Sequence, residues 1–309
     1  MNFFKPKFWD KNQISLFSIL LFPVTIIIKF LFFLKTYLTK THRSSIPIIC
    51  IGNIYLGGTG KTPLCIEIFS ILKNLKMKPA FIRKQYDLFQ DEINLQKSIG
   101  PVYQNKKRVE AVQEAVKNNI NVAILDDGFQ DFSVEKNFSI VCFTEREWIG
   151  NGLIIPSGPL RENIKSLRKY NNIFLNGNDE KIDNIINEIK NISEDINIFE
   201  AKYEPTNLEK FDESEKYLAF SGIGNHQTFV NMLKNNKLKV IKDIEFPDHY
   251  NYRVEDIDQI ISKSKALGTK IITTEKDFVK LDKSKKDQIN YIKIDLVVQD
   301  LNRIIKKLI

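Results

Sequence analysis

A glycine-rich segment that ends in lysine and threonine has the residue types and spacing of a phosphate-binding loop. A β-branched apolar run, residues 48–51, precedes the glycines, and an apolar segment with helical spacing begins at Leu64. In this order of strand, loop and helix, backbone N–H groups face a phosphate, Lys61 adds a positive charge and Thr62 offers a hydroxyl to Mg²⁺. The alternative, a purely structural glycine turn, does not require Lys-Thr at a helix start. The residues predicted to bind nucleotide phosphates are Gly57, Gly58, Thr59, Gly60, Lys61 and Thr62.

The amino-acid sequence of this loop differs from the common P-loop motif at one position. Tyr55 stands where the generic pattern has its first glycine. Pro63, in contrast, is compatible with the first turn of a helix, where its missing N–H group is not needed.

Two adjacent carboxylates, Asp126 and Asp127, follow an apolar run that we predict to be a buried strand. Such acids alone are more typical of a solvated cap, but in a P-loop protein the acid after a buried strand commonly holds Mg²⁺ or its water shell. We therefore predict that Asp126 or Asp127 completes a metal site. Arg161, in a loop rich in glycine and proline over residues 150–162, is predicted to bind an anion.

Strands and helices alternate along most of the chain, which predicts an α/β fold. Their lengths favour a doubly wound, mainly parallel P-loop sheet with its site at the carboxyl ends of the strands, and a second, smaller α/β domain. The polar stretch 84–97 is predicted to be a connection, and the strand at residues 172–175 to complete the first sheet. We predict a membrane helix within residues 1–40, a P-loop domain in 41–195, and a hinge with the smaller domain in 196–309.

Residues 14–34 are predominantly apolar, are interrupted by Pro23 and the charged Lys29, and are flanked by lysines on both sides. A helix of this length spans about 30 Å, which is the thickness of the hydrocarbon core of a bilayer. A cleaved signal peptide is disfavoured because no small-residue cleavage site follows, and a buried core helix is seldom apolar on every face. We predict a membrane anchor. Whether it crosses the bilayer or lies in its interface stays open, because both flanks are positive.

The 309 residues carry a net charge of +8, which suits nucleic acid, an anionic lipid surface or phosphorylated substrates. No basic stripe with interleaved aromatic residues and no nucleic-acid-binding module is recognisable, so we predict no nucleic-acid partner. No protein partner is evident in the sequence either. Cys50, Cys65 and Cys142 lack metal-binding spacing and are predicted to be buried thiols of a reducing compartment.

With these segments placed, the chain resembles the tetraacyldisaccharide 4′-kinases, the lipid A 4′-kinases of Gram-negative bacteria. The resemblance covers nearly the full length, includes the N-terminal membrane helix and extends to the missing first glycine of the P-loop. The motifs that carry it are Gly52-Asn53, Gly57-Gly-Thr-Gly-Lys-Thr-Pro63, Asp126-Asp-Gly-Phe-Gln130, Gly150-Asn-Gly152, Pro156-Ser-Gly-Pro-Leu-Arg-Glu162, Phe220-Ser-Gly-Ile-Gly-Asn225, Phe246-Pro-Asp-His249 and Thr273-Thr-Glu-Lys-Asp277. As an ordered set these motifs are highly specific.

The resemblance implies phosphorylation of the 4′-hydroxyl of a tetraacylated glucosamine disaccharide 1-phosphate, with ATP and Mg²⁺ as cofactors and lipid IVA as product. It also implies an enzyme of the inner membrane whose catalytic domains lie on the cytoplasmic face. The lipid A precursor and membrane lipids are then the expected partners.

The same resemblance implies roles for single residues. Asp91 matches the family's catalytic acid, and His249 matches the histidine that works with it. A sugar hydroxyl is a poor nucleophile, so a carboxylate within hydrogen-bond reach is needed to accept its proton. The implied catalytic residues are Asp91, His249 and Lys61, the implied Mg²⁺ ligands are Thr62, Asp126 and Asp127, and the implied substrate contacts are Asn53, Glu92, Gln130 and Arg161.

Two positions depart from the family's motifs. Asp131 stands where the family's Asp-Asp-Gly-x-Gln-His turn ends in histidine, and residues 84–87 lack the glycines and second arginine that follow Arg83 in the family pattern. Two other functions therefore stay open on sequence alone. One is a membrane-bound P-loop ATPase or GTPase switch, although Asn176-Gly-Asn-Asp179 lacks the lysine of a guanine site. The other is a degenerate paralogue without turnover.

Overall fold

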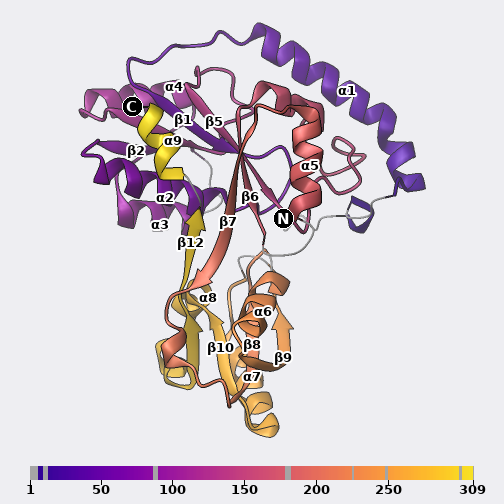
Figure 1. The fold of residues 1–309 in the computed structure, drawn as a ribbon, viewed down its shortest axis with the longest axis vertical. Helices are drawn as coiled ribbons and strands as arrows, with labels where there is room; N and C mark the ends of the chain where they lie inside the picture. Colours follow the sequence, from indigo (N-terminus) through magenta and orange to yellow (C-terminus); the bar gives the residue numbers. More distant parts are fainter. Residues whose placement is uncertain are drawn as a thin grey trace. The chain divides into compact units, whose positions relative to one another are not determined.

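The computed structural model describes residues 6–9, 13–85, 90–177, 182–224, 226–247, 250–298 and 301–308 (Figure 1). The chain forms two compact units, residues 1–202 together with 298–309, and residues 203–297. The larger unit contains the predicted P-loop, and each unit has its own parallel sheet.

The larger unit is built on an eight-stranded sheet in the order β12-β7-β6-β5-β1-β4-β2-β3. Strands β1 to β7 pair with one another in this sheet in parallel. Residues 48–52 of the central strand are all buried, as expected for a strand with helices on both faces, which explains their continuous apolar run. The strands are β1 (Ile48–Gly52), β2 (Pro79–Lys84), β3 (Val102–Asn105), β4 (Val122–Asp126), β5 (Phe138–Thr144), β6 (Asn172–Asn176), β7 (Asn197–Pro205) and β12 (Ile294–Val298).

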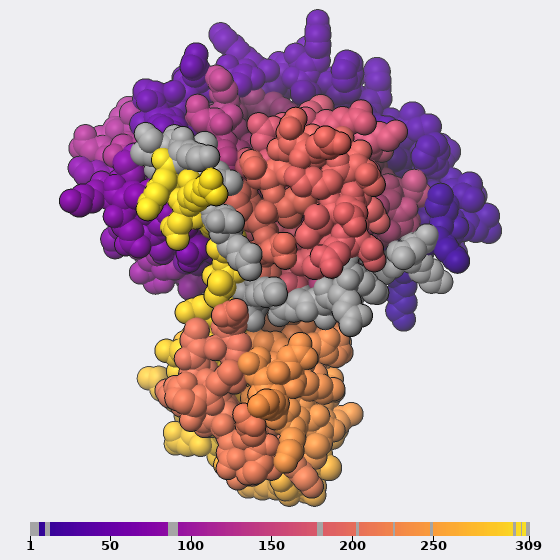
Figure 2. Space-filling model, viewed as in Figure 1, coloured from indigo at the N-terminus to yellow at the C-terminus, as the bar shows by residue number. Residues whose placement is uncertain are grey.

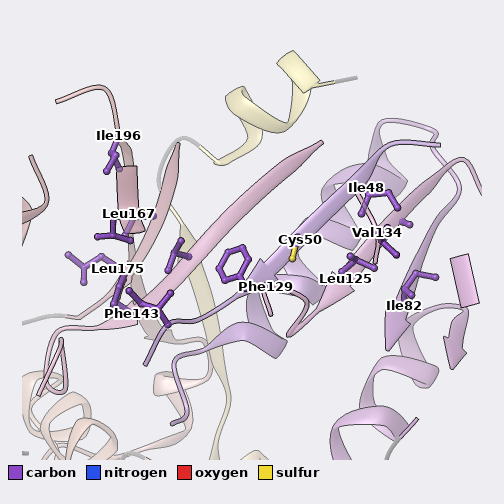
Figure 3. Close-up of a cluster of buried hydrophobic side chains, with 14 of the residues drawn as sticks. Ile48, Cys50, Ile82, Leu125, Phe129, Val134, Phe143, Leu167, Leu175 and Ile196 are labelled. Carbon is purple, nitrogen blue, oxygen red and sulfur yellow. The ribbon is translucent and has the colours of Figure 1, made fainter. Parts of the chain in front are cut away.

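Helices α4 and α5 pack on one face of this sheet, over a buried apolar cluster that runs from Ile48 to Ile196 (Figure 3). Phe129 belongs to this cluster, so the core anchors the turn at residues 126–131, which we call the acid turn. Helix α2 contacts β1, β2 and β4 and is itself contacted by α3 and α9. The helices of this unit are α1 (Leu16–Leu38), α2 (Lys61–Asn74), α3 (Gln90–Ile99), α4 (Arg108–Lys117), α5 (Ile182–Ile192) and α9 (Leu301–Leu308), with the 3-10 turns η1 (Lys7–Trp9) and η2 (Ile164–Lys169).

The smaller unit contains a second parallel sheet in the order β11-β10-β8-β9. Helix α6 packs on it through Phe229 and Leu233, and α7 packs in a separate cluster through Ile257 and Ile260. Its elements are β8 (Lys216–Ser221), α6 (His226–Asn235), β9 (Lys239–Glu245), α7 (Val254–Leu267), β10 (Lys270–Thr274), α8 (Glu275–Lys280) and β11 (Ile289–Ile292), with η3 (Leu208–Lys210) and η4 (Lys283–Gln288).

The observed elements confirm the doubly wound sheet and the second α/β part, and they correct two details. The stretch 84–97, predicted to be a connection, contains helix α3, because Ile93 and Gln96 lie three residues apart and are both buried. Strand β6 does not complete the first sheet, since β7 and β12 extend it. The compact units also differ from the predicted ranges, because 196–202 continue the first sheet and 298–309 return to it.

The apolar N-terminal segment forms α1, the one helix among the described residues that is long and apolar enough to cross a membrane. It lies along the outside of the larger unit (Figure 1) and contacts it through residues spaced seven apart. These contacts pair Ser18 with Asn151 (Oγ to Nδ2, 3.2 Å), Thr25 with Ser157 (hydroxyl to hydroxyl, 2.8 Å) and Phe32 with Phe132 (ring centroids, 5.6 Å). A narrow stripe of α1 is therefore docked over much of its length.

Candidate functional site

The glycine-rich loop lies between β1 and α2, at the carboxyl end of the central strand. Gly60 is the N-cap of α2 with a φ of 80°, a left-handed conformation that favours glycine, and an added Cβ at Gly58 would meet nothing within 4 Å. The buried Asn53 side chain donates to the carbonyl of Gly57 at 3.0 Å and to Thr59 Oγ1 at 3.1 Å. The loop is thus held on one side and open to a phosphate on the other.

Tyr55, which replaces the first P-loop glycine, is fully buried and has a structural role. It forms an isolated β-bridge with Leu160, and the two side chains pack with Ile154 in a small apolar cluster. The backbone N–H of Arg161 donates to the carbonyl of Ile54 at 2.6 Å and extends this contact. The loop 150–162 is thereby fastened to the P-loop, and its arginine lies at the acid turn.

Asp126, the last residue of β4, is buried and already paired. Its Oδ2 lies 3.0 Å from Arg83 Nη1 and accepts a hydrogen bond from Gln96 Nε2 at 2.9 Å. Arg83 also pairs with Glu92 at 2.9 Å, so β2 and α3 contribute to the same network. Burial raises the pKa of Asp126 above its ordinary value, and the attraction of Arg83 opposes this rise only in part.

Asp127 has a different environment and a φ of 54°, which is uncommon for a residue other than glycine. Arg161 Nη1 donates to Asp127 Oδ1 and to Gln130 Oε1, both at 3.0 Å. Burial raises the pKa of Asp127, but the positive charges of Lys61 and Arg161 outweigh burial and hold it below its ordinary value. The two adjacent acids therefore have pKa values shifted in opposite directions, that of Asp126 raised by burial and that of Asp127 lowered by the charges of Lys61 and Arg161.

The oxygen atoms around the loop suit Mg²⁺. Thr62, which is 9% exposed, lies in the first turn of α2, and Asp126 and Asp127 add carboxylates. Hydroxyl and carboxylate oxygens are the hard ligands that Mg²⁺ prefers. Across the described ranges, no group of three or more histidine, cysteine, aspartate or glutamate side chains could hold a metal by itself. An ion bound here would share its coordination shell with nucleotide phosphates and water, as is usual in P-loop proteins.

Arg108, the first residue of α4, supports the backbone of the acid turn. Its Nη2 donates to the carbonyl of Asp127 at 2.7 Å and to that of Asp126 at 3.2 Å. Its Nη1 lies 3.1 Å from Asp131 Oδ2, and the backbone N–H of Ser133 donates to Asp131 Oδ1 at 3.1 Å. Asp131 therefore neutralises a buried arginine, which is a structural reason for a carboxylate where the family pattern has histidine.

Replacing Asp131 by asparagine is expected to lower the free energy of unfolding by about 2 kcal/mol near neutral pH, because a buried arginine loses its carboxylate partner. Burial raises the pKa of Asp131, but hydrogen bonds from Ser133 and the charge of Arg108 lower it overall. A lowered folded-state pKa adds stability above the pKa of an unfolded aspartate, about 3.9, and this stability is lost as pH falls through the folded pKa. Urea unfolding is expected to show a smaller difference between variant and parent at about pH 3 than at about pH 7.

The control for this variant is Glu135→Gln, because Glu135 pairs only loosely with the exposed Arg43 at 3.9 Å. An exposed pair of this kind is worth less than about 1 kcal/mol. A loss in Asp131→Asn no larger than in the control, or one independent of pH, would contradict the role of the pair.

Some predicted site residues lie outside the described part of the chain. His249 is one, and the side chain of Asp91 is another, although its backbone lies in the first turn of α3. Asn53, predicted to contact substrate, is buried against the P-loop instead, and its geometry favours a role in holding the loop. Cys50, Cys65 and Cys142 are free and buried, as predicted.

Sequence reasoning missed Gln96 and Arg108, which hold the two acids in the structure. Gln96 lies in a stretch without a clear helical pattern, and its amide reaches Asp126 only because α3 folds beside β2. Arg108 stands in the first turn of α4, where a cation is unfavourable to the helix dipole. An arginine at this unfavourable position is the sequence feature from which a structural role of Arg108 could have been predicted.

Comparison with known proteins shows which family has this arrangement. The family model described as tetraacyldisaccharide-1-P 4′-kinase matches residues 17–95 and 91–309. The chain belongs to the tetraacyldisaccharide 4′-kinase family. A tetraacyldisaccharide 4′-kinase from Pelagibacter ubique is 48% identical over 305 residues, which cover 99% of this chain and 97% of that protein. A tetraacyldisaccharide 4′-kinase from Rickettsia akari is 32% identical over 295 residues, which cover 90% and 88% of the two chains.

A solved structure of a tetraacyldisaccharide 4′-kinase relative shares the fold. The crystal structure of LpxK from Aquifex aeolicus in complex with ATP matches with a TM-score of 0.64 and covers 94% of this chain and 99% of that chain. At 20% sequence identity this likeness concerns the fold. The α/β fold class and the family resemblance read from the motifs are both confirmed.

Proposed function

We propose that this member of the tetraacyldisaccharide 4′-kinase family transfers the γ-phosphoryl group of ATP to the 4′-hydroxyl of a tetraacylated glucosamine disaccharide 1-phosphate, giving lipid IVA. The observation that carries the proposal is the contact of Arg161 with Asp127 at 3.0 Å, at the carboxyl end of β4, where the charge of Lys61 also lowers the pKa of Asp127. Two cations around a carboxylate, beside a glycine-rich loop, suit the movement of a highly charged phosphoryl group. The relative from Aquifex aeolicus was solved with ATP, which supports the choice of nucleotide.

In this reaction the residues of the loop bind and neutralise phosphates. The backbone N–H groups of residues 57–60 and the N-terminus of α2 face the β- and γ-phosphates, and Lys61 balances the charge that develops on the transferred group. Mg²⁺, held by Thr62 with Asp126 or Asp127, supplies Lewis-acid neutralisation of phosphate oxygens when it is bound. Arg161, oriented by Asp127, contacts the transferred group or the acceptor.

The acceptor hydroxyl loses its proton as its oxygen attacks the γ-phosphorus and ADP leaves. We assign Asp91 to accept this proton and His249 to orient the carboxylate, following the family's motifs. Support comes from α3, because the helix whose first turn contains Asp91 also carries Glu92 and Gln96 of the network around Asp126. Glu92 and Gln130 remain proposed contacts of the acceptor.

Transfer of labelled γ-phosphate from ATP to a tetraacyl disaccharide 1-phosphate, in detergent with Mg²⁺, tests the proposal. Labelled lipid is the expected product, and it should disappear in Asp91→Ala while nucleotide binding persists. ATP hydrolysis without labelled lipid would favour the ATPase or GTPase switch. No turnover with retained ligand binding would favour the degenerate paralogue.

We also propose that α1 lies in the interface of the inner membrane, with the catalytic units on the cytoplasmic face, where ATP is available. Its contacts at Ser18, Thr25 and Phe32 are seven residues apart, which is about 10 Å along the helix axis for each step. A helix docked on a globular unit over this length cannot place the same length across a bilayer. Its remaining faces expose apolar side chains along the edge of the larger unit (Figure 2), as an interfacial helix does.

Replacing Leu20 and Phe30, which are 66% and 59% exposed, by glutamate is expected to release the protein from lipid vesicles. Each side chain loses about 1.5–3 kcal/mol of transfer free energy, so partitioning should fall by about 100-fold or more. Co-sedimentation with phosphatidylglycerol-containing vesicles measures this. Val279→Glu, at an apolar position of the smaller unit that is 69% exposed, is the matched control. Equal release of both proteins would contradict a contact made by α1.

A further inference from the structure

The loop 150–162 carries Arg161 and has little regular structure of its own. All of its residues are described, and they form no helix or strand, only isolated β-bridges at Ile154 and Leu160. Ser157, in the second half of the loop, is nevertheless fully buried. Because buried backbone N–H and C=O groups need hydrogen-bond partners, the loop depends on neighbouring elements for its shape.

The segment after β1 binds the end of the loop that carries Arg161. The backbone N–H of Leu56 donates to the carbonyl of Pro159 at 2.8 Å, and the N–H of Arg161 donates to the carbonyl of Ile54 at 2.6 Å. The Arg161 side chain lies 3.0 Å from Asp127, and both line a cavity of about 400 Å³ together with lysines of α1, β2 and the segment before α4. A shift of the loop would therefore move a guanidinium group at the proposed site of reaction.

The hydroxyl of Thr25, in the middle of α1, binds the same loop from its other neighbour. Thr25 is 2% exposed. Its Oγ1 donates to the carbonyl of Ile154 at 3.3 Å, accepts from the backbone N–H of Ser157 at 3.3 Å and lies 2.8 Å from Ser157 Oγ. A hydroxyl has one donor and two acceptor positions, so the loop uses the full hydrogen-bonding capacity of this side chain.

Two further side chains of the N-terminal segment bind the loop near its start and its middle. Ser18 Oγ accepts from Asn151 Nδ2 at 3.2 Å, and Trp9 Nε1 donates to the carbonyl of Pro156 at 3.0 Å. The backbone N–H of Asn151 also donates to the carbonyl of Trp9 at 2.9 Å. The loop is thus bonded to the N-terminal segment on one side and to the segment after β1 on the other.

These contacts explain an unusual distribution of side chains on α1. The buried residues of this helix are Ser18 and Thr25, whereas large apolar side chains such as Leu20 and Phe30 are exposed. Burial of a hydroxyl costs free energy unless it is hydrogen-bonded, and a helix that only packed on a core would bury its apolar residues instead. The buried face of α1 is therefore suited to binding the polar backbone of the loop.

We propose that Thr25 and Ser18 are positioning residues for phosphoryl transfer, because from the apolar helix they keep the loop 150–162 in the shape that places Arg161 beside Asp127. This inference rests on the proposed function, in which Arg161 contacts the transferred group or the acceptor. A catalytic group displaced by about 1 Å can cost roughly 100-fold in rate, even when the change lies far from the chemistry. The helix that faces lipid is then also part of the support of a catalytic side chain.

The experiment replaces Thr25 by valine, which keeps the size of the side chain and removes its hydroxyl. The kcat for transfer of labelled phosphate, measured in detergent, is expected to fall by about 10-fold with little change in the KM for ATP. Thr25→Ser should restore most of this loss. In an Arg161→Gln background, Thr25→Val should lower kcat no further, because the group that the hydroxyl positions is already gone.

The matched control is Thr36→Val, since the hydroxyl of Thr36 donates to the carbonyl of Phe32 in the same helix at 2.9 Å. This variant should keep the kcat of the parent. Amide hydrogen exchange tests the loop independently of transfer, and residues 150–162 should exchange about 10-fold faster in Thr25→Val than in the parent or the control. Binding of Thr25→Val to lipid vesicles should stay unchanged, because valine at this buried position leaves the exposed faces of α1 as they are.

An unchanged kcat, an equal fall of kcat with and without Arg161, or unchanged exchange of the loop would each overturn the proposal. Loss of vesicle binding by Thr25→Val would also contradict it, because the hydroxyl would then act through attachment to the membrane. No labelled lipid from the parent, together with faster loop exchange in Thr25→Val, would instead refute the proposed kinase reaction and leave the binding of the loop by α1 supported.

Discussion

Replacing Lys61 by alanine is expected to lower kcat for phosphate transfer by about 1,000-fold while leaving the fold intact. Lys61 begins α2 at the glycine-rich loop. Among the positive charges that lower the pKa of Asp127, that of Lys61 has the largest effect. As the phosphoryl group leaves ADP, charge spreads over its oxygens, and loss of one preorganised charged contact costs about 3–4 kcal/mol in the transition state. Steady-state transfer of labelled phosphate to the lipid acceptor measures the effect.

The matched control for Lys61→Ala is Lys73→Ala, in the last turn of the same helix and exposed. It removes an equal charge from α2 and should keep kcat close to that of the parent. Urea unfolding of both variants checks that the fold is unchanged. A fall of less than about 10-fold in Lys61→Ala would show that the lysine does not stabilise the transition state.

Replacing Arg83 by methionine is expected to lower the free energy of unfolding by about 3 kcal/mol. The Asp126 side chain is 1% exposed and that of Arg83 is 12% exposed, and their atoms lie 3.0 Å apart. Removal of one partner leaves an uncompensated buried charge, which is the costly case for buried ion pairs. Activity should fall as well, because the attraction of Arg83 helps to keep Asp126 ionised. Chemical unfolding and the transfer assay measure the two effects separately.

A second variant separates the stability effect from the catalytic effect. Arg83→Met combined with Asp126→Asn removes the buried charge at position 126 and leaves only Glu92, which is 27% exposed, without its arginine, so most of the lost stability should return. Activity should not return, because the amide is a poor substitute for a carboxylate beside Mg²⁺. A double variant that is active, or one as unstable as Arg83→Met alone, would contradict this account of Asp126.

The sequence was most informative where a motif lies within one short segment. The residues 57–62 could be recognised because a strand, a glycine loop and a helix follow one another, and each step has a local physical reason. The acids at 126 and 127 and Arg161 were recognised from their positions after a strand and in a loop. The structure brings Asp127 and Arg161 within 3.0 Å of each other.

Sequence reasoning is less informative where the environment of a residue depends on a partner that is distant in the chain. Asn53 was predicted to contact substrate, yet it is buried and bonded to the P-loop. Tyr55 replaces a glycine of the common P-loop motif. In the structure it packs against Leu160 as a buried apolar residue. Asp131 is a departure in the acid turn, and the structure pairs it with Arg108, twenty-three positions earlier in the chain.

The sequence by itself determined the fold class, the family, the glycine-rich loop between a strand and a helix, and the presence of an apolar N-terminal helix. These depend on local propensity, hydrophobic periodicity and short motifs, which are properties of neighbouring residues. Only the tertiary structure decided that Asp126 is paired and that the pKa of Asp127 is lowered, that α1 docks along the larger unit by one stripe, and that lysines from α1, β2 and the segment before α4 line one cavity. Each of these depends on side chains that are far apart in the chain and meet only when the strands are placed side by side.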